Sequence, residues 1–180
     1  MITTLDVETT FHVGETKRTD PTPFHPKNRL VSVQYNTCDN LDPQFVWFYH
    51  EKKSPDLPVA HSQVQQILNK TTLLVGHNIK FDLVWLWESG FSYSGKVYDT
   101  MIGEYLLLRG QKYSLSLHDA CIRREVTLKK SDLTKDYLTR GVGFDRMPCE
   151  IVEEYGKADV VSTRELYEHQ QKLFKNSVMQ

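Results

Sequence analysis

Two acidic residues near the N-terminus are the first candidates for chemistry. Asp6 and Glu8 stand two residues apart in a short run of apolar and β-branched residues. Residues two apart on a strand share a face, so two carboxylates there would lie side by side and repel each other. A divalent cation would remove that cost, whereas a strand end in water would tolerate it. The pair therefore indicates either a metal site or a solvated strand end.

A second carboxylate follows a glycine that ends an apolar run. Residues 76–82 read Gly-His-Asn-Ile-Lys-Phe-Asp, and a helix that starts near Asn78 would place Asn78 and Asp82 on one face. A strand that ends at Gly76 puts both at the C-terminal edge of a sheet, where α/β proteins usually bind ligands. In the alternative interpretation, Asn78 caps the helix and Asp82 is an acid that suits its first turn.

The third pair, Tyr155 and Asp159, is four residues apart in a helical pattern and so lies on one helix face. In the alternative interpretation the tyrosine packs and the aspartate is exposed. Ile151, Val152 and Ala158 place this face close to the apolar side of the helix, where an unpaired carboxylate would be costly. The pattern therefore favours a functional site.

The elements that must position these residues follow from the periodicity of the apolar residues. Strands come first along the chain, then a mixture, then mostly helix, which favours a central mixed β-sheet with helices packed on it. A long proline-bearing connection spans residues 11–29, and the whole chain, 1–180, is predicted to be a single domain. Strands are predicted over 2–7, 30–35, 44–49, 72–76 and 96–98, and helices over 59–69, 79–89, 99–109, 114–124 and 149–173.

Composition limits the class of protein. The 22 basic and 23 acidic residues give a net charge of −1, which excludes the strongly basic balance of non-specific duplex binders. Nucleic acid stays open as a substrate, because carboxylate-bound cations can meet phosphates instead. The three cysteines lie far apart and form no Cys-x-x-Cys pair, which fits a reducing cytoplasm. No apolar run is long enough for a membrane span, so no membrane partner is expected.

Taken in order, these three segments resemble the 3′–5′ exonuclease domain of family A DNA polymerases. This is the tyrosine-bearing branch of the DEDD exonucleases, and the resemblance covers nearly the whole chain. Asp99 before a helix matches a further family segment, and the long loop before Leu30 is similar to that of phage-encoded members. The sibling branch has a histidine five residues before its last aspartate, where this chain has Glu154. The resemblance implies an α/β, RNase H-like fold with a central mixed β-sheet flanked by α-helices.

The resemblance also implies a metal site. Two divalent ions roughly 4 Å apart can stabilise both ends of an in-line displacement at phosphorus, and all-oxygen ligands suit Mg²⁺ or Mn²⁺. Asp6 would bridge both ions, Glu8 and Asp159 would complete one site, and Asp82 would hold the second ion. Tyr155 would orient the attacking water.

Three further residues are candidates for contact with the end of the substrate strand, and two of them, Asn78 and Phe81, match family positions. Asn78 and Phe81 would contact the terminal nucleotides, although the apolar pattern by itself favours a core position for Phe81. Thr9 would offer its backbone N–H or its hydroxyl near the 3′ end.

The resemblance implies a metal-dependent 3′–5′ exonuclease that releases nucleoside 5′-monophosphates from single-stranded or frayed DNA 3′ ends. Proofreading in phage or bacterial replication is the expected role, and a DNA polymerase is a candidate partner. The chain of 180 residues has no polymerase domain, so we expect either a separately encoded exonuclease or one domain of a longer polymerase. A ribonuclease D-like RNA-trimming nuclease and a non-catalytic nucleic-acid-binding module are the alternatives.

Overall fold

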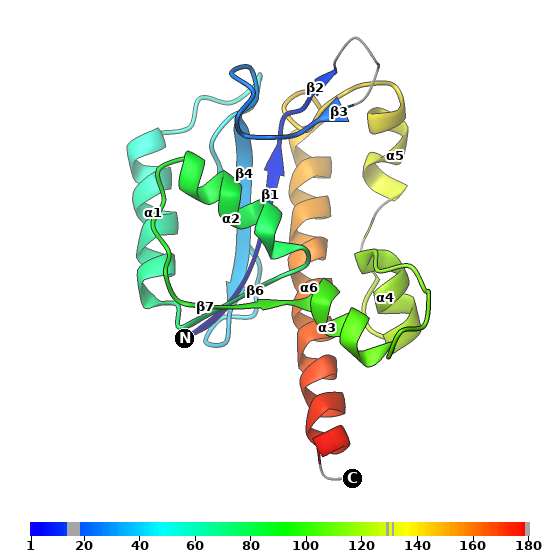
Figure 1. Ribbon diagram of the computed structural model, residues 1–180. Coiled ribbons are helices and arrows are strands. Elements are labelled where there is room, and N and C mark those ends of the chain that lie inside the picture. The colour runs from blue at the N-terminus through cyan, green and yellow to red at the C-terminus, as the bar shows by residue number, and fades with distance from the viewer. Residues whose placement is uncertain (14–18, 129, 131, 179–180) are drawn as a thin grey trace.

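The computed structural model describes residues 1–13, 19–128, 130 and 132–178 (Figure 1). Residues 14–18 of the predicted long connection lie outside the described residues. The strands are β1 (Ile2–Thr9), β2 (His12–Val13), β3 (Thr19–Asp20), β4 (Leu30–Thr37), β5 (Gln44–Trp47), β6 (Leu73–Gly76) and β7 (Lys96–Asp99). The helices are α1 (Leu57–Lys70), α2 (Ile79–Glu88), α3 (Thr100–Leu107), α4 (Leu117–Arg124), α5 (Asp132–Thr139) and α6 (Cys149–Val178).

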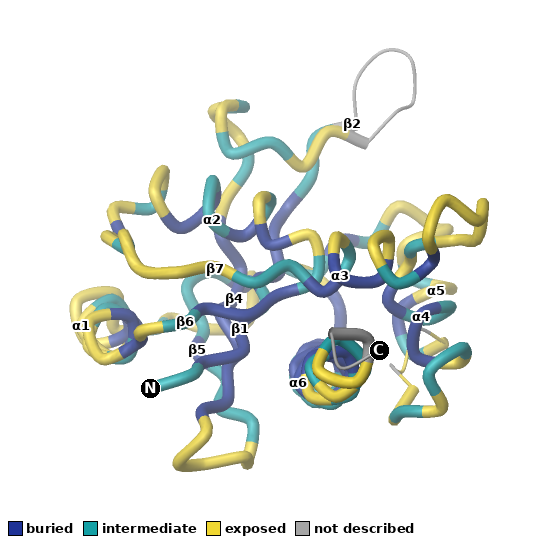
Figure 2. The backbone as a smooth tube through the Cα atoms, turned by 60° about the horizontal axis from the view of Figure 1, so that its bottom comes forward, coloured by how far each residue is buried: buried dark blue, intermediate teal, exposed yellow. Residues whose placement is uncertain are grey.

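The main sheet has five strands in the order β5-β4-β1-β6-β7. β4 pairs antiparallel with both β1 and β5, whereas β6 pairs parallel with β1 and β7. The sheet is therefore mixed, as the sequence predicts, and β1 is its central strand. Figure 2 shows β1 and β4 buried in the middle of the molecule. A side chain on β1 is thus covered by another element on either face.

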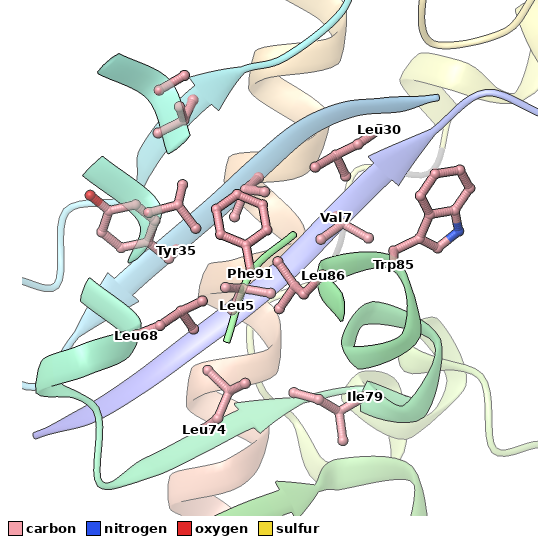
Figure 3. Packing of buried hydrophobic residues seen from close by; sticks show 14 residues of the cluster. Leu5, Val7, Leu30, Tyr35, Leu68, Leu74, Ile79, Trp85, Leu86 and Phe91 are labelled. Carbon is pink, nitrogen blue, oxygen red and sulfur yellow. The ribbon is translucent and has the colours of Figure 1, made fainter. Parts of the chain in front are cut away.

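The two faces of β1 carry different residues. Leu5 and Val7 pack into the apolar core with side chains of α1 and α2 (Figure 3). Because side chains alternate along a strand, Asp6 and Glu8 lie on the opposite face. α6 crosses that opposite face and contacts β1, β4 and β6. The alternation of β1 therefore separates the core from the acidic residues.

The predicted elements differ from the observed ones at their ends, and β2, β3 and α5 were not predicted. α4 starts at Leu117 and not at 114, because the hydroxyl of Ser116 caps it by accepting the N–H of Asp119. α5 has no counterpart among the predicted helices. Its apolar pattern is short and its buried residue is the polar Thr134, so the apolar periodicity of the sequence does not indicate a helix there. α6 continues to Val178, beyond the predicted end at 173. Among the described residues, no helix is both long and apolar enough to cross a membrane.

Candidate active site

Three carboxylates from two elements meet on the face of the sheet that α6 covers. Asp6 and Glu8 come from β1 and Asp159 from α6, and one oxygen of each lies within 4.8 Å of the others. Glu8 and Asp159 are both only 6% exposed. The strand end is therefore not solvated, and Asp159 is not an exposed residue of an amphipathic helix. Both alternative interpretations of these acids are wrong.

Asp82 lies in the first turn of α2 and is 2% exposed. Its Oδ1 accepts the backbone N–H of Val7 at 3.0 Å. The N–H of Val7 is available to a side chain because the pairing of β6 with β1 ends earlier, at Thr4 and Val75. Burial, and then the negative charge of Asp6, hold the pKa of Asp82 well above its ordinary value. An ionised Asp82 therefore carries an energetic cost in the folded protein.

Tyr155 lies one turn before Asp159 on α6, and its ring stacks on Phe144 with 5.6 Å between ring centroids. Burial raises the pKa of its hydroxyl far above 10, and the negative charges of Glu8, Asp159 and Asp6 raise it further. A hydrogen bond that the hydroxyl donates to Asp159 acts in the same direction. The hydroxyl is therefore neutral near pH 7 and lies among the acids.

Asn78 does not cap α2 with its side chain, contrary to the alternative interpretation of that segment. Its backbone is left-handed, with φ 59° and ψ 42°, a conformation that asparagine tolerates better than most residues. Its N–H donates to Oδ1 of Asp99 at 2.9 Å, and the same oxygen accepts the N–H of Met101 at 2.8 Å. Asp99 therefore joins the starts of α2 and α3 through two backbone N–H groups. Asn78 itself is exposed.

The four acids and the tyrosine line one pocket of approximately 430 Å³. Asn78 lies at this pocket too, as does Phe81, which is half-buried and also packs against the apolar core. Thr9 follows a register shift in the pairing of β1 with β4, is 6% exposed, and is not among the described residues that line the pocket. The structure thus gathers every predicted site residue except Thr9.

Sequence reasoning missed two residues. Gln34 on β4 is fully buried and donates from Nε2 to Oδ2 of Asp6 at 2.6 Å. His77 contacts the hydroxyl of Thr100 through Nδ1 and the carbonyl of Leu115 through Nε2, both at 2.9 Å, which ties the chain before α4 to the pocket. Gln34 occupies one of the alternating polar positions of its strand, but only the register of β4 against β1 identifies Asp6 as its partner.

The donor set fits a hard divalent cation. Carboxylate oxygens are the ligands that Mg²⁺ and Mn²⁺ prefer, and three of them converge here from Asp6, Glu8 and Asp159. Like charges held this close destabilise the folded protein, and a bound cation would offset their repulsion.

We expect Mg²⁺ or Mn²⁺ to raise the midpoint of thermal unfolding. An ion that binds only the folded state at 100 times its Kd adds about 2.7 kcal/mol, roughly 5–10 °C for a domain of this size. Circular dichroism with EDTA, with the metal chloride and with NaCl at equal ionic strength measures the shift. An unchanged midpoint at saturating metal would contradict a preformed cluster.

The fold is that of the 3′–5′ exonucleases, an RNase H-like arrangement shared with several solved structures. One is Brucella melitensis NrnC, with TM-score 0.62 and 19% identity over 98% of this chain and 74% of that chain. Another is the POL domain of Pol1 from M. smegmatis in complex with a DNA primer-template and dNTP, with TM-score 0.53 and 14% identity over 93% and 23%. The family B DNA polymerase of Pyrobaculum calidifontis gives 0.55 and 18% over 93% and 24%.

The sequence matches the 3′–5′ exonuclease family over residues 14–175, so the chain belongs to that family and is an exonuclease. Asp82, Tyr155 and Asp159 lie within the matched residues, whereas Asp6 and Glu8 precede them. The packing of α6 across β1 brings those two acids to Asp159. No curated protein matches the sequence significantly.

Proposed function

We propose that this chain is a metal-dependent 3′–5′ exonuclease that hydrolyses single-stranded or frayed DNA 3′ ends to nucleoside 5′-monophosphates. The observation that supports this best is the cluster of Asp6, Glu8 and Asp159, with oxygens within 4.8 Å of one another. It opens on a pocket that Asp82 also lines. Family membership supports the polarity of degradation.

In this proposal Asp6, Glu8, Asp82 and Asp159 would hold two divalent ions, Mg²⁺ or Mn²⁺, and Asp6 would serve as a ligand to both. When bound, the ions would stabilise charge on the attacking and leaving oxygens of the phosphodiester. The protein contributes the placement of its carboxylates. Glu8 and Asp159 are fixed by burial between the sheet and α6, and Asp82 is fixed by its hydrogen bond to the N–H of Val7.

Tyr155 orients the attacking water in this proposal. Its hydroxyl lies among the acids and is neutral near pH 7, so it can donate one hydrogen bond and accept another. Asn78 is exposed at the same pocket and Phe81 is half-buried there, which suits contacts with the terminal nucleotide. Contact of Thr9 with the 3′ end stays a prediction.

Proofreading beside a DNA polymerase, in the cytoplasm during phage or bacterial replication, is the role that we propose for this activity. The second candidate is trimming of RNA 3′ ends. The similarity to NrnC supports this candidate, because this chain covers 74% of NrnC but only about a quarter of the polymerases. One NrnC structure is also bound to pGG. The same carboxylate site serves both sugars, so the substrate must be measured.

We expect single-stranded DNA to be degraded from its 3′ end in Mg²⁺ or Mn²⁺ and to stay intact in EDTA. Oligomers labelled at the 5′ end should give a ladder of shortened products, and the same oligomers labelled at the 3′ end should release labelled mononucleotide at once. RNA of matched sequence should be cut more slowly. Denaturing gels over a time course measure all three rates.

Two other outcomes of this experiment would support the alternative functions. Faster cleavage of the RNA oligomer would replace the DNA proposal with RNA trimming. An intact substrate at saturating metal, with the strand still bound in a gel-shift experiment, would indicate the non-catalytic module. A blunt duplex of the same sequence serves as the control, because its paired 3′ end should react much more slowly than a frayed one.

A further inference from the structure

Gln34 contacts two of the clustered acids directly. It lies opposite Asp6 in the β1–β4 register, and its amide nitrogen Nε2 is 2.6 Å from Oδ2 of Asp6 and 3.5 Å from Oε1 of Glu8. The side chain is 0% exposed. A hydrogen bond to a charged group in a buried site is stronger than one between neutral groups. A single amide therefore connects the two repelling carboxylates of β1.

The orientation of this amide follows from its partners. Ionised carboxylates can only accept hydrogen bonds, so the NH₂ group of Gln34 must face Asp6 and Glu8. The other end of the amide, Oε1, accepts the hydroxyl of Ser32 at 3.2 Å. Ser32 is two residues away on the same face of β4 and lies opposite Glu8 in the register. Both ends of the Gln34 amide are thus satisfied inside the protein.

α6 covers this amide at a glycine. A Cβ at Gly156 would lie 2.9 Å from both Cδ and Nε2 of Gln34 and 3.1 Å from the ring of Phe45. Only a residue without a Cβ lets the helix approach so closely. Gly156 stands directly after Tyr155 and three residues before Asp159. The close approach at Gly156 therefore also sets how near Asp159 comes to the acids of β1.

We propose that Gln34 is a positioning residue for the metal site. Its amide holds the Asp6 and Glu8 side chains at the spacing at which they meet Asp159, before an ion arrives. Two like charges on one strand face repel, and a buried N–H dipole between them offsets part of that repulsion. Without this donor the two carboxylates move apart, and an ion must bring them together as it binds. This inference rests on the metal-binding role proposed above for Asp6 and Glu8.

The test is Mn²⁺ affinity, measured by isothermal titration calorimetry without substrate. Gln34→Met keeps the length of the side chain and removes the donor. We expect its Kd for Mn²⁺ to rise about 10- to 100-fold, the usual effect of losing a partner of a metal ligand. The Mn²⁺ concentration for half-maximal cleavage should rise by a similar factor. Gln34→Leu, which has another shape and also lacks a donor, should show the same loss.

Gln170→Met is the matched control. Gln170 is also 0% exposed, and its Nε2 donates to the carbonyl of Thr100 and to Glu104, not to the clustered acids. This control should lose stability but keep wild-type Mn²⁺ affinity, because it removes a buried amide from elsewhere. A purely structural role for Gln34 makes the same forecast for Gln34→Met. Wild-type Mn²⁺ affinity in folded Gln34→Met or Gln34→Leu protein would therefore overturn the proposal.

Asp6→Asn separates this inference from the proposed function. If Asp6→Asn loses Mn²⁺ binding while both Gln34 variants keep it, the positioning role is wrong and the metal site stands. If Asp6→Asn binds Mn²⁺ as tightly as the wild type, the metal site itself is assigned wrongly. Circular dichroism on each variant defines the temperature range in which it is folded, and the titrations are performed within that range.

Discussion

Asp82→Asn is expected to reduce cleavage of single-stranded DNA by roughly 10³-fold or more. In the proposed mechanism Asp82 holds a metal ion, and losing that ion would remove about 4 kcal/mol of transition-state stabilisation. Asparagine retains Oδ1, so the hydrogen bond from the N–H of Val7, 3.0 Å long in the wild type, can persist. The substitution therefore removes the charge and leaves the start of α2 in place. Single-turnover rates on a 5′-labelled strand at saturating Mg²⁺ measure the loss.

Asp56→Asn provides a control of the same chemical type. Asp56 is exposed and caps α1, where asparagine is an equally good cap. The cleavage rate of Asp56→Asn should equal that of the wild type. An Asp82→Asn protein that cleaved within tenfold of the wild type would remove Asp82 from the metal site.

Asp82→Asn should also be more stable than the wild type in EDTA at pH 7. Burial and the charge of Asp6 raise the pKa of Asp82 in the folded state above its usual 3.8, so folding an ionised Asp82 costs stability. That cost is complete above the raised pKa and disappears as the pH falls below 3.8. The advantage of Asp82→Asn should therefore be present at neutral pH and vanish in acid. Thermal midpoints measured in EDTA across this pH range give the sign directly.

Tyr155→Phe is expected to lower kcat by roughly 10²- to 10³-fold, the effect of losing one positioned group that acts in the transition state. The substitution keeps the ring that stacks on Phe144 and removes only the hydroxyl. KM and Mn²⁺ affinity should change little, because a contact made mainly in the transition state affects kcat. Single-turnover kinetics with metal titrated for both proteins separates these quantities.

Tyr167→Phe is the control from the same helix. Tyr167 is buried against Tyr98, away from the acids, and loses an identical hydroxyl. It should cleave at the wild-type rate. A wild-type rate in Tyr155→Phe as well would mean that Tyr155 only packs, and that catalysis depends on the carboxylates and their ions.

The local geometry of the site follows from the sequence. A strand period of two puts Asp6 and Glu8 on one face, and a helical period of 3.6 residues does the same for Tyr155 and Asp159, which are four residues apart. The strand that ends at Gly76 and the helix after it place Asp82 at the edge of the sheet. These inferences need only short-range periodicity, and the structure has each of these elements close to its predicted bounds.

Apart from the family resemblance, which groups these residues in one site, only the tertiary structure decided how those local faces meet. β1 became the central strand and α6 crossed its acidic face, which brought Asp159 to Asp6 and Glu8. The partner of Gln34 depends on the register between β4 and β1, and a shift by one residue would turn Gln34 away from Asp6. Periodicity within one segment carries no information about which segment it will face, because that choice is made by packing between elements far apart in the sequence.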